Sequence, residues 1–187
     1  MPRSGAAARA RLREAALELY GEQGYDATTT AQIAARAGLT ERTYFRHFAD
    51  KREVLFDGEQ ELFDVMRGAI AAAPGDSTPL RLVMGAYLAA VPLFVAGWST
   101  AQRRARIIET SPALQERAHA KVAALSEVLA GALQERDVPQ PLARLAVRAG
   151  TAVFEHAGAA WTGRSSADLE ALLAQGYDEL RALTSAN

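Results

Sequence analysis

Cysteine is absent from the 187 residues of this chain. Its absence excludes disulfides, thiolate nucleophiles and zinc sites with cysteine ligands. Strand signatures are also missing, because no run alternates apolar and polar residues with many β-branched side chains and no Asn-Gly or Asp-Gly pair joins two such runs. The first residues lack the apolar core of a signal peptide, and no uninterrupted apolar run reaches about 18 residues. We therefore expect no membrane span and a cytoplasmic protein.

Helical signals fill most of the chain. Apolar residues make up 49% of it and charged residues 23%, which is enough to bury a core. Apolar side chains recur at helical spacing, so the sequence predicts an all-α fold of about nine helices. The expected helices are a first one that ends near residues 21–24, two short ones at 29–37 and 40–48, a longer one at 50–72, and five at 79–96, 98–109, 112–136, 140–162 and 166–184.

Charge is distributed unevenly along the chain. Residues 1–52 carry nine Lys or Arg against six Asp or Glu, whereas residues 53–187 carry twelve against sixteen. A basic N-terminal segment favours a polyanionic partner. Differences of this size also arise by chance, so the charge pattern supports a nucleic-acid partner only together with a motif.

Residues 29–48 contain two short helices joined by about three residues. Thr29 and Gln32 form an expected capping box at the start of the first helix, and Thr40 caps the second. A steep crossing needs a small residue at the contact and a left-handed residue in the turn, which suits Ala34 and Gly38. The pattern predicts a helix-turn-helix whose second helix enters the DNA major groove. An ordinary corner between two helices is the alternative.

The same region resembles the N-terminal domain of the TetR-family transcriptional regulators. The resemblance covers residues 9–56 and rests on Tyr25, Thr28, Thr29, Ile33, Ala34, Gly38, Leu39, Thr40, Thr43, His47, Phe48, Lys51 and Leu55. It implies a DNA-binding domain at residues 1–56 and a helical effector-binding and dimerisation domain at residues 57–187. It also implies a homodimeric repressor that binds a palindromic double-stranded DNA operator and leaves it when a small, largely apolar effector binds.

The resemblance, carried over by position, places ten side chains at the DNA. They are Thr29, Thr30, Thr40, Glu41, Arg42, Thr43, Phe45, Arg46, His47 and Lys51. The positions matching phosphate contacts are those of Thr29, Thr30, Thr40, His47 and Lys51. The positions matching base contacts are those of Glu41, Arg42 and Thr43, and an arginine can hold guanine through two hydrogen bonds.

Two positions depart from the family pattern. Phe45 stands where the family often has a tyrosine, so we expect apolar contact with a thymine methyl group or a sugar. Ala31 is too short to read a base, which leaves base reading to the second helix.

Other roles are open for some residues of the second helix. Arg46 could be a solvated charge instead of a DNA contact, and Glu41 could serve only the dipole of its helix. Tyr44 and Phe48 are expected in the core.

Aromatic and methionine side chains are spread over several helices of the body. Such side chains can line an apolar effector pocket between helices. The candidate pocket residues are Met66, Met84, Tyr87, Phe94, Trp98, His119, Phe154 and Trp161. Pro92 is expected to kink its helix, and Gly97 to separate it from the next, which leaves room between helices. The alternative is that these side chains only form a core.

The last two predicted helices carry small and apolar faces. The expected dimer interface consists of Ala149, Val153, Ala157, Ala160, Leu169, Leu172, Leu173, Tyr177 and Leu180. Two such helices from each subunit would form a two-fold bundle. The alternative is that the apolar stripe packs within its own chain.

An enzyme is the other class of protein to weigh. The chain has three histidines, and it has no Gly-rich phosphate loop, His-Glu-x-x-His pair or nucleophile elbow. We therefore expect no catalysis, no cofactor and no metal site. A helical protein that binds a small molecule without touching DNA is a further alternative.

Overall fold

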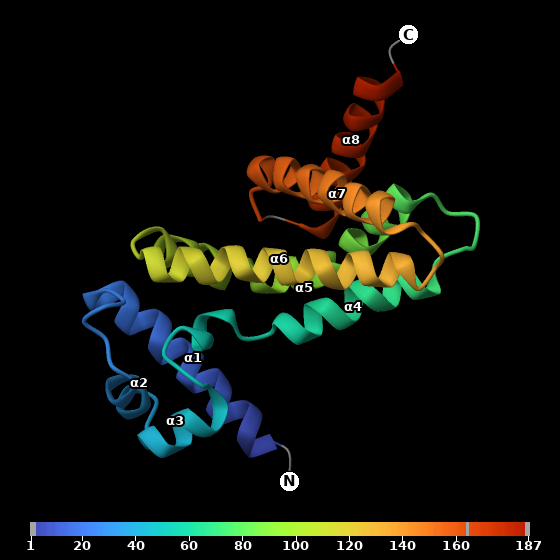
Figure 1. The fold of residues 1–187 in the computed structure, drawn as a ribbon. Helices are drawn as coiled ribbons and strands as arrows, with labels where there is room; N and C mark the ends of the chain where they lie inside the picture. The colour runs from blue at the N-terminus through green and yellow to red at the C-terminus, as the bar shows by residue number, and fades with distance from the viewer. Residues whose placement is uncertain (1–2, 164, 186–187) are drawn as a thin grey trace. The chain divides into compact units, whose positions relative to one another are not determined.

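The structure, a computed structural model, describes residues 3–163 and 165–185. Within these residues there are eight α-helices, one short 3-10 helix and no strand, which confirms the predicted all-α fold (Figure 1). The elements are α1 (Arg3–Gln23), α2 (Thr30–Arg36), α3 (Glu41–His47), η1 (Glu53–Phe56), α4 (Glu59–Ala72), α5 (Pro79–Glu109), α6 (Pro112–Gln134), α7 (Gln140–Ala160) and α8 (Ser166–Ser185).

Helix α5 is longer than the sequence predicted. The expected division into helices at 79–96 and 98–109 is wrong, because one helix continues through Pro92 and Gly97. Pro92 is exposed, whereas Val91 before it is fully buried. Burial of the neighbouring side chains offsets the backbone hydrogen bond that a proline removes.

Helix α5 is also more apolar than expected. By length and composition alone it could cross a membrane, since an 18-residue window has a mean hydropathy of 1.8. The expectation of no membrane span stays a prediction, because the core helix of a protein without a membrane span can have the same length and composition. In the structure the buried face of α5, including Val83, Tyr87 and Val91, supplies core side chains.

The helix expected at residues 50–72 is interrupted. Asp50 Oδ1 accepts from the backbone N–H groups of Arg52 at 2.7 Å and Glu53 at 3.1 Å, but the turn that these bonds close leads into the short 3-10 helix η1. The chain then becomes extended at Asp57, and Gly58 has φ +92. Arg9 binds the Asp57 carboxylate at 2.6 Å, which holds this break against α1. Helix α4 begins only after it.

The chain forms two compact units. The first, which we call the head, comprises Met1–Glu59 and Thr100–Lys121. Its apolar core joins α1, α2, α3 and η1 to the last part of α5 and the first part of α6 through buried side chains that include Leu12, Ile33, Tyr44, Leu55, Ile107 and Leu114. The head therefore includes a segment that lies far along the chain. The predicted boundary at residue 56, between a DNA-binding domain and an effector-binding and dimerisation domain, stays a prediction.

The second unit, which we call the body, comprises Gln60–Ser99 and Val122–Asn187. One apolar cluster joins α4, α5, α6 and α7 around Met66, Tyr87, Leu129 and Val147. Another joins α5, α7 and α8 around Val91, Trp161 and Leu173. Phe94 and Phe154 pack against both clusters, so the body has one continuous apolar interior.

Candidate functional site

Helix α2 begins at a side-chain cap. Thr29 Oγ1 accepts from the Gln32 backbone N–H at 3.2 Å, and Gln32 Oε1 accepts from the Thr29 backbone N–H at 2.8 Å. This confirms the predicted capping box, which satisfies two N–H groups that the helix cannot bond itself. The Thr29 side chain is exposed, so it is accessible to a partner beyond the cap.

The turn from α2 to α3 depends on one glycine. Gly38 has φ +66, a conformation that side chains with a Cβ disfavour. The turn is closed by a hydrogen bond of 2.8 Å from the Leu39 N–H to the carbonyl of Ala34, which is itself buried. Thr40 then caps α3, because its side chain accepts from the Thr43 N–H. Both roles predicted for this turn are confirmed.

Helix α3 has a buried and an exposed face. Tyr44 and Phe48 are 0% and 3% exposed, which confirms that they belong to the core. The Tyr44 hydroxyl donates to the Asp50 carbonyl at 3.0 Å, which ties α3 to the segment that follows it. The opposite face presents Glu41, Arg42, Phe45 and Arg46 to solvent, and Phe45 is 52% exposed.

Thr30 and Glu41 contact each other across the two helices. The Thr30 hydroxyl donates to Glu41 Oε1 at 2.5 Å. Thr43 is partly buried, and its hydroxyl lies 3.0 Å from that of Thr40. Several of the predicted DNA-contacting side chains therefore also hold one another in place.

Lys51 is held inside the head. Its Nζ donates to the carbonyls of Tyr25 at 2.9 Å and Thr28 at 3.3 Å, and it lies 4.0 Å from the centroid of the Tyr25 ring. The sequence predicted a phosphate contact for this residue. The ammonium group fixes the turn that leads into α2, and a phosphate would have to compete with these carbonyls, so the phosphate contact stays a prediction.

His47 is half-buried at the end of α3. Its Nε2 atom is covered and has no hydrogen-bond partner within the described part of the chain. Burial lowers the pKa of His47, and the nearby charges of Arg46 and Arg9 lower it further. A neutral imidazole can still donate one hydrogen bond to a phosphate, but it adds no positive charge there.

Sequence reasoning missed the anchor of α2 to α1. Arg36 bonds Glu22 at 2.8 Å and Glu18 at 3.0 Å, and these hydrogen bonds raise the pKa of Arg36. Glu18 and Glu22 are four residues apart on α1, so they share one face. The sequence signal that could have indicated this ion pair was the combination of Arg36 in the predicted second helix with two glutamates on one face of the first.

A second missed network lies at the start of α4. Arg117 donates to Glu53 Oε1 at 2.7 Å and to Glu59 Oε2 at 3.1 Å, and its guanidinium lies 4.8 Å from the centroid of the Phe56 ring. Lys121 Nζ lies 3.9 Å from Glu59 Oε1. The partners are 58 or more positions apart in the chain, so no local motif marks them.

Burial shapes the electrostatics of this network. It lowers the pKa of Lys121 to about 8, and repulsion from Arg104 adds to the effect. Burial likewise lowers the pKa of Arg104, whose Nη1 donates to the Leu55 carbonyl at 3.3 Å. The head therefore carries two cations that the fold partly desolvates.

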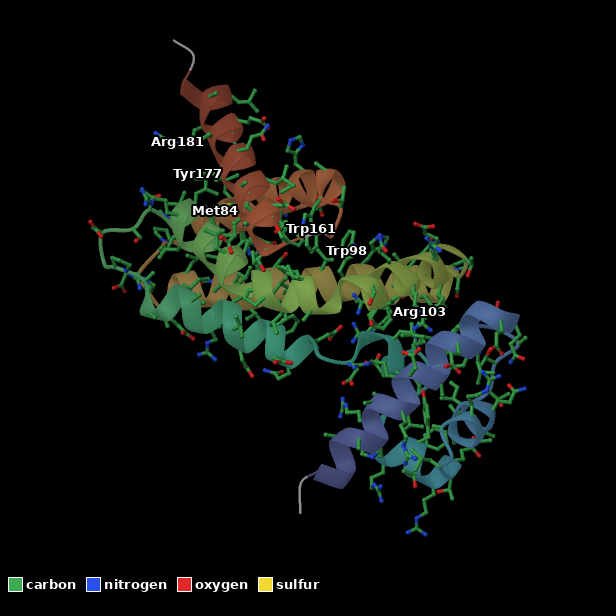
Figure 2. All side chains as sticks on the ribbon, turned by 180° about the vertical axis from the view of Figure 1, so that it is seen from behind. Met84, Trp98, Arg103, Trp161, Tyr177 and Arg181 are labelled. Carbon is green, nitrogen blue, oxygen red and sulfur yellow. The ribbon has the colours of Figure 1, made fainter. Side chains whose placement is uncertain are left out.

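The body brings most of the predicted pocket residues together. Tyr87 stacks on Phe154 with ring centroids 4.6 Å apart, and Phe94 lies 4.7 Å from Phe154. Trp98 and Trp161 lie side by side, 4.5 Å apart (Figure 2). Met66 and Met84 are buried in the two apolar clusters of the body. His119 differs from the other seven, because it is exposed and belongs to the head.

The turn between α7 and α8 packs closely on Trp98. Gly163 has φ +77, and a Cβ atom at this position would lie 1.9 Å from Trp98 Nε1. The Trp161 indole donates to the Ser165 carbonyl at 3.2 Å, which fixes the same turn. No residue near Gly163 in the sequence indicates that this position must stay small.

The predicted dimer residues divide into two groups. Four are buried within the chain against α5 and each other, namely Val153, Ala157, Leu169 and Leu173. The other five keep some exposure, namely Ala149, Ala160, Leu172, Tyr177 and Leu180. Three large apolar side chains that were not predicted are more exposed: Leu142 at 46%, Leu145 at 63% and Leu183 at 82%.

Comparison with known proteins adds two family matches. The model of the bacterial regulatory proteins of the tetR family matches residues 12–57, and that of the MftR C-terminal domain matches residues 77–184. The regulator TcmR of Streptomyces glaucescens is 40% identical over 78 residues, which are 42% of this chain and 34% of TcmR. The chain thus spans about a third of the length of that relative.

Solved structures share the fold over nearly the whole chain. SmeT, the repressor of the SmeDEF multidrug efflux pump of Stenotrophomonas maltophilia, is 19% identical in its triclosan complex, with a TM-score of 0.63 over 95% of this chain and 91% of SmeT. NalD, the secondary repressor of the MexAB-OprM pump in Pseudomonas aeruginosa, is 23% identical, with a TM-score of 0.55 over 93% of this chain and 96% of NalD.

Proposed function

Because the chain belongs to the TetR family of bacterial regulatory proteins, we propose that it is a cytoplasmic, homodimeric repressor that binds a palindromic DNA operator. The observation that carries this proposal is the exposed face of α3, where Arg42, Phe45 and Arg46 project beside a capped and anchored turn. A helix fixed in this way can enter the major groove without reorganising.

The proposed division of labour on α3 follows from side-chain chemistry. The Arg42 guanidinium can donate two hydrogen bonds to guanine, and the exposed Phe45 ring can contact a thymine methyl group. Arg46 and the N-terminal ends of α2 and α3, at Thr29 and Thr40, suit phosphate oxygens. Lys51, whose ammonium group bonds the Tyr25 and Thr28 carbonyls, stabilises the turn before α2 and so keeps this surface in place.

The proposed homodimer uses the side chains that the body leaves exposed. Leu142 and Leu145 on α7 lie three residues apart, and Ala149 extends the same side of the helix by one turn. Leu183 on α8 is 82% exposed. Pairing these surfaces between two copies would remove exposed apolar area from water.

The proposed effector is a small, largely apolar molecule bound among the aromatic side chains of the body. Phe94, Trp98 and Phe154 are only partly buried, so they are candidates to contact it. SmeT, which has the same fold, has been solved with triclosan. The signal would pass through α4, whose first residue Glu59 is held in the head by Arg117. The proposed connection is therefore α4, which begins at Glu59, and not one continuous helix from residue 50 as the sequence predicted.

The test is an electrophoretic mobility shift with DNA that flanks the protein's own gene. We expect a sequence-specific complex that an excess of competitor DNA of unrelated sequence does not displace. Arg42→Ala should weaken it by roughly 1–3 kcal/mol, whereas Arg81→Ala, an equal charge change at an exposed site of the body, should not. Equal losses in both variants, or no specific complex with the intact protein, would overturn the proposal.

A further inference from the structure

Glu41 is an unusual residue for a surface that faces DNA. A carboxylate repels phosphates, yet Glu41 is exposed at the first position of α3, beside Arg42. Its Oε1 atom accepts the Thr30 hydroxyl at 2.5 Å, and Thr30 is the first residue of α2. The described part of the chain supplies no other hydrogen bond or ion pair to this carboxylate, so Oε2 is available to a partner.

The hydrogen bond restricts where the carboxylate points. A free glutamate side chain has several rotatable bonds and loses conformational freedom when a partner orders it. Thr30 has already ordered this one, because its hydroxyl holds Oε1 from the neighbouring helix. A group held in its bound geometry binds its partner at a smaller entropic cost.

The chemistry of a carboxylate limits what it can read. It only accepts hydrogen bonds at neutral pH, and the major groove offers donors at the cytosine N4 and adenine N6 amino groups. Adenine presents an N7 acceptor beside its amino group, which would repel a carboxylate. Guanine presents only acceptors in this groove, so it would be rejected as well.

We propose that Glu41 selects a cytosine by accepting a hydrogen bond from its N4 amino group, and that Thr30 is the positioning residue that aims it. The inference rests on the proposed DNA-binding function and deepens it. Thr30 then acts through Glu41 and not, as the resemblance implied, by holding a phosphate. Glu41 does more than complement the dipole of α3, because it carries sequence information.

The experiment is selection from a randomised double-stranded DNA library, followed by binding of the selected duplex and of duplexes altered at single base pairs. The proteins are the full chain, Glu41→Gln, Thr30→Val and Thr30→Ser. For the full chain we expect a C·G preference at one position in each half-site, worth roughly 5- to 100-fold in affinity. Glu41→Gln should move that preference towards adenine, which a glutamine amide can bond through two hydrogen bonds.

Thr30 separates positioning from phosphate contact. Thr30→Val should lower affinity severalfold for the duplex with cytosine and much less for duplexes altered there. Thr30→Ser keeps the hydroxyl and should restore the preference. A loss in Thr30→Val that is equal for all duplexes would show a phosphate contact and overturn the positioning role.

Three further results would overturn the inference. If Glu41→Gln selects the same sequence as the full chain, Glu41 reads no base. If the full chain selects no sequence at all, the proposed function itself fails. A selected operator with no cytosine preference that depends on Glu41 sinks only the inference about this residue.

Discussion

The head and the body hold their aromatic side chains in different ways. In the head, tyrosine hydroxyls bond backbone carbonyls, as Tyr20 does with Lys51 at 2.5 Å and Tyr44 with Asp50 at 3.0 Å. In the body, aromatic rings mainly pack on other rings, as in the pair of Phe94 with Phe154. Two aromatic side chains of the body also make hydrogen bonds, Trp161 to the Ser165 carbonyl and Tyr87 to Thr151, so the difference is one of degree: hydrogen bonds to the backbone prevail in the head and ring packing in the body.

This difference fits the two proposed tasks. Hydrogen bonds to the backbone have narrow geometry, so they keep α2 and α3 in one arrangement that can match DNA. Apolar packing is less directional, and hydrophobic cores tolerate rearrangement at constant volume. A body built in this way can accept a small molecule among its rings.

The largest expected effect distinguishes the buried from the exposed apolar side chains of the body. Leu173 is 0% exposed within one chain, so Leu173→Glu buries an unpaired charge and should lower the free energy of unfolding by about 3–5 kcal/mol. Leu145 is 63% exposed, so Leu145→Glu should leave the chain folded and separate the dimer. Circular dichroism follows the first effect, and size-exclusion chromatography with light scattering follows the second.

The matched pair is decisive because both substitutions introduce the same charge. If Leu173→Glu instead gives a folded monomer, Leu173 belongs to the interface after all. If Leu145→Glu stays dimeric with unchanged DNA affinity, the exposed face of α7 is not where two copies meet.

The second effect concerns the turn over Trp98. Gly163→Ala places a methyl group against the indole and forces a φ of +77 on a residue with a Cβ atom, so we expect a loss of about 2–4 kcal/mol in stability. Trp98→Ala removes the collision but not the backbone strain. Adding Gly163→Ala to Trp98→Ala should therefore cost less than adding it to the intact chain. Equal costs in urea unfolding would show that the indole does not set the size limit.

Local signals explain why the head was predictable. The capping box of Thr29 and Gln32, the Thr40 cap and the left-handed Gly38 all act within a few residues of chain, and the structure contains each of them. Periodicity also placed Tyr44 and Phe48 in the core. Asp50 accepts backbone N–H bonds where the sequence predicted the start of a long helix, but such bonds precede a 3-10 turn as readily as a long helix.

The remaining features depend on contacts between distant segments. Nothing near Arg117 indicates that it bonds Glu53 and Glu59 across 64 and 58 positions. Whether Leu173 faces its own chain or a second copy depends on α5, because the apolar stripe of α8 satisfies both arrangements. Hydrophobic spacing shows which face of a helix is apolar, but it leaves open what covers that face.

The third effect tests the charges that the head desolvates. Lys121 has a pKa lowered from 10.5 to about 8, first by burial and then by Arg104, although Glu59 opposes the shift. Between these values the unfolded chain binds a proton that the folded chain does not, so this lysine makes stability rise with pH from about 8 to 10.5. Below pH 8 the folded chain bears the full cost of a buried ammonium group.

Lys121→Met removes this linkage. The variant should match or exceed the full chain in stability at pH 7, and the difference between them should shift by roughly 1–3 kcal/mol in favour of the full chain as the pH rises to 10. Urea unfolding at a series of pH values measures the difference. Parallel stability curves for the two proteins would mean that Lys121 is well solvated.

The smallest effect asks whether Lys51 belongs to the framework of the head or to its DNA-facing surface. Its ammonium bonds the Tyr25 and Thr28 carbonyls, so Lys51→Met should lower the stability of the folded chain by about 1–2 kcal/mol. Because the ammonium group is bonded to these carbonyls, we expect it not to neutralise a DNA phosphate. The variant should therefore keep the salt dependence of DNA affinity. Arg46→Met, at an exposed site of α3, should instead reduce the slope of log affinity against log salt by about one unit. Fluorescence anisotropy on one duplex between low and moderate salt compares the slopes, and thermal unfolding compares the stabilities. A flatter slope in Lys51→Met with unchanged stability would return Lys51 to the phosphate contacts.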